Sequence, residues 1–137
     1  MSSAEHQIQL NALAKALEER GVEITHLDID GKPEHFDHRY RTLPTPNEMD
    51  GSIPDLIGIK DGVLHIGESK TDIRGDANID AQFRVFSNRI MSATKQPIPF
   101  HIVVPKRLGQ TINDKLIEIG LSDKKDSDRI IVWTHGE

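Results

Sequence analysis

Residues 54–70 read PDLIGIKDGVLHIGESK and have the pattern of a β-hairpin. Both halves of this stretch are rich in β-branched and aliphatic side chains, which are enriched in strands. Asp61-Gly62 lies between the halves and is the kind of dipeptide favoured in two-residue type I′ turns, because both central residues of such a turn need positive φ. The sequence therefore predicts two antiparallel strands joined at Asp61 and Gly62.

A two-residue turn also fixes which side chains face one another across the hairpin. The expected cross-strand pairs are Lys60 with Val63, Ile59 with Leu64, Ile57 with Ile66, and Asp55 with Glu68. Directly opposed side chains have Cβ atoms about 4.5 to 5.5 Å apart. Lys70 returns to the face of Glu68 because side chains alternate along a strand. Two carboxylates and a lysine are therefore expected together at one end of an apolar strip.

Two carboxylates that face each other across a sheet repel unless a cation lies between them. At the expected separation both could reach one divalent cation, whose oxygen ligands lie at about 2.0 to 2.6 Å. Hard oxygen ligands favour Mg²⁺ or Mn²⁺ over zinc. A simpler interpretation stays open, in which the carboxylates are solvated strand ends and Lys70 pairs with one of them. The convergence of three such groups favours the metal site.

The order Pro54-Asp55, twelve intervening residues, then Glu68-Ser69-Lys70 resembles the signature of the PD-(D/E)xK nuclease superfamily. This superfamily includes many restriction endonucleases, archaeal Holliday-junction resolvases, and RecB-type and VRR-type nuclease domains. The resemblance implies an α/β fold with a restriction endonuclease-like αβββαβ core, in which helices flank a central mixed sheet. It also implies an Mg²⁺- or Mn²⁺-dependent nuclease, either an endonuclease or an exonuclease. Asp55, Glu68 and the Ser69 backbone carbonyl would hold the metal, and Lys70 would orient or help to deprotonate the attacking water.

The resemblance adds two further residues to the predicted site. Gln82-x-x-x-Phe86 is similar to the Gln-x-x-x-Tyr pattern of RecB-like members, with the phenol lost. An acidic residue on the first helix often joins the metal site of the superfamily, and Glu18 borders that helix's apolar stripe, whereas Glu19 points to the opposite side. For both candidates a surface role stays open: Gln82 as a flanking polar residue and Glu18 as a solvated helix end.

Outside the hairpin, hydrophobic periodicity and breaker residues predict alternating helices and strands. Helices are expected over residues 3–20, over residues 108–120 and around the stripe Ile79, Phe83, Phe86 and Ile90. Strands are expected over residues 22–30, 99–104 and 129–134. The unbroken apolar run of residues 102–104 suits a central strand that is covered on both faces, and residues 129–134 are expected at the edge of the sheet.

Residues 31–52 are the least regular part of the sequence. Their length between two strands suggests a functional loop or an extension of the sheet. His35 and His38 could ligate a metal from a helix, but the simpler interpretation is a pair of solvated loop histidines. If the resemblance holds, this segment approaches the active face, and Tyr40 and Arg41 could contact substrate.

The composition fits one globular domain, residues 1–137, with 36% hydrophobic and 28% charged residues. The absence of cysteine excludes disulfides, thiolate zinc sites and cysteine nucleophiles, and is consistent with a reducing compartment. The first twenty residues lack the basic and apolar regions of a signal peptide, and no stretch approaches the length of a membrane span. We therefore expect a cytoplasmic protein that does not contact a membrane.

The formal net charge of −5 argues against a strong non-specific grip on nucleic acid, because such affinity comes from many cationic contacts to phosphates. Local charge matters more than the total. A basic edge around the site is expected from Arg84, Arg89, Lys95, Lys106 and Arg107. The acidic residues Asp76 and Asp80, and those of residues 123–128, are then expected to face elsewhere.

Three functions follow from these observations. The leading one is a metal-dependent nuclease acting on nucleic acid, DNA ahead of RNA, as a homodimer or within a larger DNA-processing complex. The second is a catalytically silent nuclease-fold module that binds nucleic acid or a protein partner. The third is a small α/β interaction domain whose resemblance is accidental, in which case Asp55 need not lie opposite Glu68.

Overall fold

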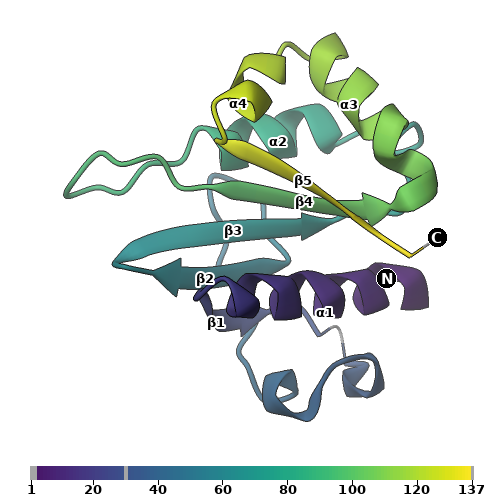
Figure 1. Ribbon diagram of the computed structural model, residues 1–137, viewed down its shortest axis with the longest axis vertical. Coiled ribbons are helices and arrows are strands. Elements are labelled where there is room, and N and C mark those ends of the chain that lie inside the picture. Colours follow the sequence, from purple (N-terminus) through teal and green to yellow (C-terminus); the bar gives the residue numbers. More distant parts are fainter. Residues whose placement is uncertain (1–2, 30, 137) are drawn as a thin grey trace.

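Helices on both faces of a mixed β-sheet make up the computed structural model of the protein, which describes residues 3–29 and 31–136 (Figure 1). The elements are α1 (Ala4–Glu19), β1 (Glu23–Leu27), β2 (Leu56–Lys60), β3 (Val63–Ser69), α2 (Ile79–Ser87), β4 (Phe100–Pro105), α3 (Gly109–Glu118), α4 (Ser122–Asp126) and β5 (Ile130–His135). Short 3₁₀ helices, η1 (Pro33–His35), η2 (His38–Tyr40) and η3 (Lys106–Leu108), occupy connections. The predicted α/β class is confirmed, and the helices and strands follow the expected order except for α4, which the sequence did not predict.

Within the described residues the sheet has five strands in the order β1-β2-β3-β4-β5. The first three strands are antiparallel neighbours, whereas β3, β4 and β5 run parallel. Every residue of β4 is buried, as expected of a strand covered on both faces, and β5 lies at the edge as predicted. None of the helices that the structure describes is long and apolar enough to span a membrane.

The hairpin of β2 and β3 has the predicted turn and register. Asp61 and Gly62 both have positive φ, 51° and 79°, as a type I′ turn requires. The paired residues are Leu56–Gly67, Ile57–Ile66, Gly58–His65, Ile59–Leu64 and Lys60–Val63. The local chemistry of the turn therefore sets the alignment of the whole hairpin.

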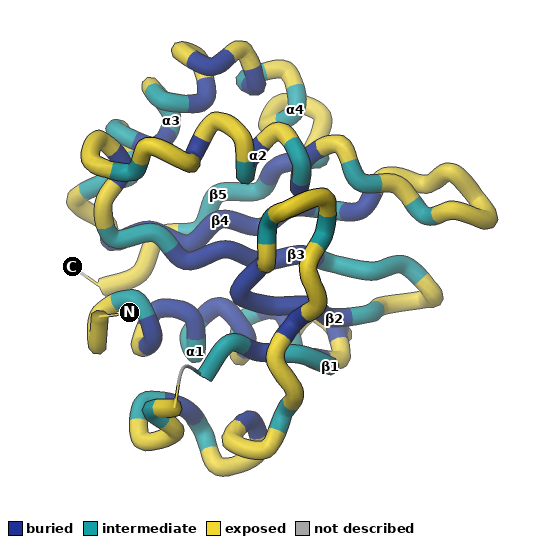
Figure 2. Tube along the Cα trace, turned by 180° about the vertical axis from the view of Figure 1, so that it is seen from behind, coloured by how far each residue is buried: buried dark blue, intermediate teal, exposed yellow. Residues whose placement is uncertain are grey.

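Two apolar clusters pack on opposite faces of the sheet. On one face α1 buries Leu10, Leu13 and Leu17 against the strands. On the other face α2 and α3 contribute the larger cluster, which includes Phe83, Phe86, Phe100, Ile102, Ile112 and Leu116. The dark traces of β3 and β4 between these layers in Figure 2 mark the centre of the core.

Helix α1 begins and ends as the sequence predicts. The Ser3 side chain accepts a hydrogen bond from the His6 backbone N–H and caps the first turn. Gly21, with φ of 88°, ends the helix in the left-handed region that glycine adopts without strain.

Two expected boundaries are wrong. The first strand ends at Leu27, because the backbone of Leu27 then bonds to Pro44 and that of Asp28 to Asp55; the expected end, Asp30, lies outside the described residues. Helix α2 ends at Ser87, so Ile90 is not part of its stripe. Ile90 is 44% exposed and forms a backbone bridge with Pro97.

Gly58 is required where β2 passes the start of β1. A Cβ at this position would lie 2.6 Å from Val22 Cγ1 and 2.9 Å from the Glu23 carbonyl oxygen. Gly58→Ala is therefore expected to lower the free energy of unfolding by about 2 kcal/mol in chemical denaturation. Gly109→Ala is the control, because its Cβ would meet Thr134 at an ordinary 3.5 Å and should change stability by less than about 0.5 kcal/mol. Equal effects of the two changes would contradict this assignment.

A chain of hydrogen-bonded rings crosses the sheet on its α1 face. Trp133 Nε1 donates to His101 Nδ1 at 3.0 Å, so the proton of neutral His101 is on Nε2 and is donated to His65 Nδ1 at 2.9 Å. Burial above all, with smaller effects of the neighbouring His65 and Arg20, lowers the pKa of His101 to about 3. His101 is therefore neutral in the folded protein.

This buried neutral histidine predicts a loss of stability in acid. Because the folded-state pKa lies below the unfolded value of about 6.5, the unfolded chain binds the extra proton between these values. The contribution is present above about pH 6.5 and is lost as pH falls towards 3. Chemical denaturation should show the wild type losing about 3 kcal/mol more than His101→Gln between pH 7 and pH 4. Parallel pH profiles would contradict the assignment.

Candidate active site

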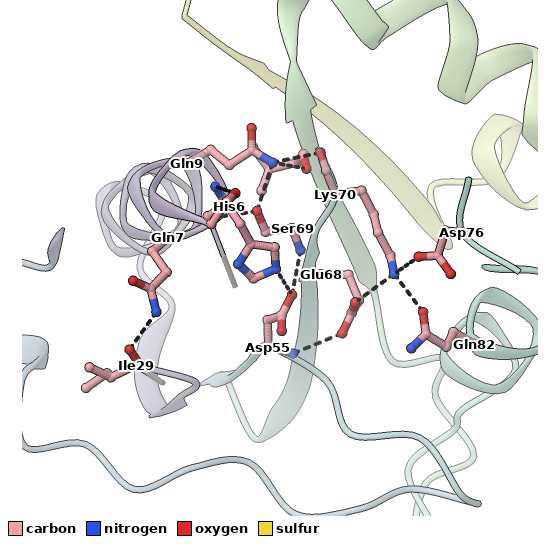
Figure 3. Close-up of polar contacts among 12 residues, drawn as sticks. His6, Gln7, Gln9, Ile29, Asp55, Glu68, Ser69, Lys70, Asp76 and Gln82 are labelled. Atoms are coloured by element: carbon pink, nitrogen blue, oxygen red, sulfur yellow. Dashed lines mark hydrogen bonds and ion pairs between the residues drawn. The ribbon is translucent and has the colours of Figure 1, made fainter. Parts of the chain in front are cut away.

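The predicted carboxylate pair lies at the end of the hairpin, where β2 begins and β3 finishes. The Asp55 backbone N–H donates to the Gly67 carbonyl at 3.0 Å, which continues the pairing one residue beyond the ladder. This places the side chains of Asp55 and Glu68 beside each other (Figure 3). They are buried, with 8% and 3% of their surfaces exposed. The structure thus brings together the two residues that the turn register pairs.

Each carboxylate is held by a backbone N–H of the neighbouring strand end. Glu68 Oε1 accepts from the Asp55 N–H at 3.0 Å, and Asp55 Oδ2 accepts from the Ser69 N–H at 2.9 Å. These reciprocal bonds fix both side chains relative to the sheet. They leave Glu68 Oε2 and Asp55 Oδ1 as the oxygens available to a ligand.

The site concentrates negative charge in a buried place. Burial raises the pKa of Glu68 well above its usual range, and the neighbouring Asp55 carboxylate raises it further. The Lys70 ammonium, 3.8 Å from Glu68 Oε2, acts in the opposite direction. A cation between the two carboxylates would remove this repulsion.

Lys70 follows β3 and has three polar partners. Its Nζ donates to Asp76 Oδ2 at 2.6 Å and to Gln82 Oε1 at 2.8 Å, in addition to its approach to Glu68 (Figure 3). The predicted candidate Gln82 is therefore brought to the site from α2. Phe86, one turn later, is in the core instead.

The expectation that Asp76 faces away from the site is wrong. The connection from β3 to α2 turns back on itself, with the Gly75 N–H donating to Asp72 and the Asn78 N–H to Asp76. This turn aims Asp76 at Lys70. Partial burial opposes ionisation of Asp76, but the hydrogen bond from Lys70 and that from Asn78 outweigh it, and the pKa of Asp76 lies below its usual value.

Two residues of α1 belong to the site although the sequence did not identify them. His6 Nε2 lies 3.2 Å from Asp55 Oδ2, and its backbone carbonyl accepts from Ser69 Oγ at 2.8 Å. Gln9 is fully buried, and its Nε2 donates to Ser69 Oγ, to the Lys70 carbonyl and to the Val103 carbonyl. The available signal was positional, since residues 6 and 9 continue the buried stripe of α1 towards its N-terminus.

Glu18 is not brought to the site. It lies in the last turn of α1 and its Oε2 is 3.5 Å from Arg39 Nη2. The site contacts the first turns of the same helix, at His6. Glu18 is about 18 Å from His6 along the helix axis, at about 1.5 Å per residue. The prediction failed because the angle around a helix identifies a face but not the end that approaches the sheet.

Residues 31–52 also differ from the expectation. Tyr40 is a core residue of the α1 face, and its hydroxyl accepts from Arg39, so its predicted contact with substrate is wrong. Arg41 donates to the Phe36 carbonyl, and His35 lies 3.9 Å from Glu34. The first part of this segment packs against α1 through Phe36 and Tyr40, whereas its last part lies on the other side of the sheet, where Met49 packs against the larger cluster and Asp50 pairs with Arg89.

The polar groups open into a pocket of about 580 Å³. Its lining includes His6, Asp55, Glu68, Lys70, Asp76 and Gln82, and Ile53 from the segment before β2. As the candidate active site, this space is called the catalytic pocket. This volume is large enough for a phosphate group and several water molecules.

The side chains in the catalytic pocket fit a hard divalent cation such as Mg²⁺ or Mn²⁺. Among residues 3–29 and 31–136, no three His, Asp or Glu side chains form a ready-made metal cage. Mg²⁺, however, is commonly bound by one or two carboxylates together with waters and substrate phosphates. Asp55 and Glu68 would provide the two carboxylates. The Ser69 hydroxyl is already engaged with His6 and Gln9, so only the backbone carbonyl of Ser69 stays a predicted ligand.

The predicted basic edge is divided between two places. Arg84, Arg89 and Lys95 line a second pocket beside α2. Arg107 instead forms a two-pronged ion pair with Glu5, at 2.7 and 2.8 Å, and Lys106 begins η3 at the end of β4. The five cations therefore do not form one edge.

Comparison with known proteins gives no relative for this chain: no family model, no curated protein and no solved structure matches it. What the catalytic pocket does is therefore inferred from its own residues.

Proposed function

We propose that this protein is an Mg²⁺- or Mn²⁺-dependent nuclease that hydrolyses phosphodiester bonds, in DNA ahead of RNA. The observation that carries the proposal is the buried pair Asp55 and Glu68, with Lys70 beside it, at the wall of an open polar pocket. Buried like charges destabilise a fold, and perturbed ionisable groups that meet in a cleft are typical of functional sites. The motif around these residues resembles the nuclease signature described above.

The metal would be held by Asp55 and Glu68, with the Ser69 carbonyl as a third protein ligand. When bound, a divalent cation polarises the phosphate and lowers the pKa of a bound water. The chain's own part is to hold both carboxylates in place through the backbone N–H groups of Asp55 and Ser69. Such preorganised groups stabilise developing charge without having to rearrange.

Lys70 acts in this proposal as a donor. Its ammonium already donates to Asp76 and Gln82, which orient it across the catalytic pocket. From this position it would orient the attacking water and stabilise the negative charge that develops on the phosphate. Asp76 and Gln82 are positioning residues, because they act through Lys70.

A panel of labelled linear, circular, junction and single-stranded substrates, each with Mg²⁺, Mn²⁺ or EDTA, tests the proposal. We expect cleavage of at least one substrate that requires the metal and stops in EDTA. Asp55→Asn protein, purified in the same way, controls for contaminating nucleases. Cleavage that is equal in the two preparations, or no cleavage across DNA and RNA forms of the panel, would overturn the proposal.

A catalytically silent module is the second candidate. The net charge of −5 and the engagement of Lys70 by Asp76 favour it, since both weaken a grip on phosphates. Titration calorimetry with Mn²⁺ separates the two functions. A nuclease site takes up the ion and loses that uptake in Asp55→Asn, whereas a silent module shows no uptake that depends on Asp55.

A further inference from the structure

A second pocket, of about 510 Å³, lies further along α2. Its charged lining residues are Asp50, Arg84, Arg89 and Lys95, and Val85 and Asn88 of the same stretch also face it. We call it the basic pocket. It adjoins the segment between α2 and β4, which projects from the body of the protein in Figures 1 and 2.

The catalytic and basic pockets share the same two walls. On one wall, Gln82 of α2 lines the catalytic pocket and Val85, one turn later, lines the basic pocket. On the other, the turn closed by Met49 and Ser52 places Ile53 at the first pocket and Asp50 at the second. The ion pair of Asp50 with Arg89, at 3.1 Å, holds the two walls together. A single extended ligand could therefore contact both pockets.

The two pockets have opposite charge. The catalytic pocket is lined by four carboxylates, those of Asp55, Glu68, Asp72 and Asp76, and by the single cation Lys70. The basic pocket has three cations against the single acid Asp50. The chain as a whole has a net charge of −5, so this local excess of positive charge is an exception. Such an excess attracts an anionic ligand.

The cations of the basic pocket are available to such a ligand. Arg89 pairs with Asp50, but that carboxylate is mostly exposed, and exposed ion pairs are weak. The Nε of Arg89 is buried and has no hydrogen-bond partner among the described residues. Lys95 forms no ion pair with any residue that the structure describes. Arg84 is the least available, because it binds Asp80 and the Ile119 carbonyl.

We infer that the basic pocket is a phosphate-binding subsite, in which Arg89 and Lys95 hold the backbone of the nucleic acid strand beyond the bond that is cleaved. From Gln82 to Asn88 the helix and its cap rise about 9 Å at about 1.5 Å per residue. This is about three base steps at about 3.4 Å each. Contacts of this kind position a strand without reading its sequence. The distance to the cleaved bond rests on the proposed function, whereas the binding of phosphates does not.

Binding of a labelled single-stranded DNA 15-mer in EDTA, followed by fluorescence polarisation, tests the subsite without cleavage. The double variant Arg89→Gln/Lys95→Gln should raise Kd about tenfold and reduce the slope of log Kd against log salt by about 1.4, because two phosphate contacts are lost. The matched control is Lys15→Gln/Lys60→Gln, which removes the same charge from exposed residues that line neither pocket. Its Kd should change less than twofold.

The outcomes separate the subsite from the nuclease. Equal weakening in both double variants, unchanged binding in both, or a wild type that does not bind the 15-mer would overturn the subsite. Suppose that the wild type cleaves no substrate, and that DNA binding is weakened in Arg89→Gln/Lys95→Gln but not in the control. This outcome would support the subsite and contradict the nuclease. Metal-dependent cleavage together with unchanged binding in that variant would do the reverse.

Discussion

Asp55→Asn is expected to abolish metal-dependent cleavage, with a loss on the order of 10³-fold or more, equivalent to about 4 kcal/mol of transition-state stabilisation. The substitution keeps the shape of the side chain but removes one of the two anionic ligands proposed for the metal. It also removes the repulsion between Asp55 and Glu68, which is unfavourable in this buried place. The free energy of unfolding should therefore stay the same or rise while activity disappears.

Asp61→Asn is the matched control for this variant. It removes one negative charge from the opposite end of the same hairpin, and Asn-Gly is as compatible with the type I′ turn as Asp-Gly. Cleavage should be retained in full. Undiminished cleavage in Asp55→Asn, or an equal loss of cleavage in Asp61→Asn, would contradict the assignment of the metal site.

Lys70→Met should lower the cleavage rate on the order of 10²- to 10³-fold, because the donor that stabilises developing charge is lost. Uptake of Mn²⁺ should persist or strengthen in calorimetry, since the substitution removes a positive charge 3.8 Å from Glu68 Oε2. This combination separates Lys70 from the metal ligands. A variant that loses metal uptake together with cleavage would contradict the role proposed for Lys70.

Two further variants control for structural effects of Lys70→Met. Asp76 loses its partner in the single variant, so Lys70→Met/Asp76→Asn should recover stability without recovering cleavage. Lys60→Met removes a lysine from the exposed end of β2 in the same hairpin and should leave the rate unchanged. Recovery of cleavage in the double variant would mean that Lys70 has no direct role.

The parts of the fold that were predictable are those set by local chemistry. The register of β2 and β3 followed from two turn residues, because side chains alternate along paired strands and a fixed turn leaves one alignment. The limits of α1 followed from Ser3 and Gly21 in the same way. The order of helices and strands gave the class of the fold, and the apolar run of residues 102–104 marked the strand that both helical layers cover.

The parts that were not predictable depend on how distant elements meet. The register aligned Asp55 with Glu68, but only the packing of α1 shows that His6 lies against Asp55. The same packing brings Gln9 to the end of β3 and leaves Glu18 beside Arg39. Asp76 is similar, because a turn in the connection before α2 decides its direction. Spacing along α1 places residues 6 and 9 on its buried face, but it does not say which end of that face meets the hairpin, nor where Asp76 points.

Gln9 has a consequence for when the candidate site can form during synthesis of the chain. Its one amide nitrogen bonds to segments that are far apart in the chain, Ser69 and Lys70 at the end of β3 and Val103 in β4. The helix at the start of the chain can therefore complete its contacts around the carboxylate pair only after about three quarters of the chain has been synthesised. A nascent or truncated chain that lacks β4 would lose the contact of this amide with Val103, and α1 would dock against an incomplete sheet. Assembly of the catalytic pocket is in this way coupled to completion of the sheet.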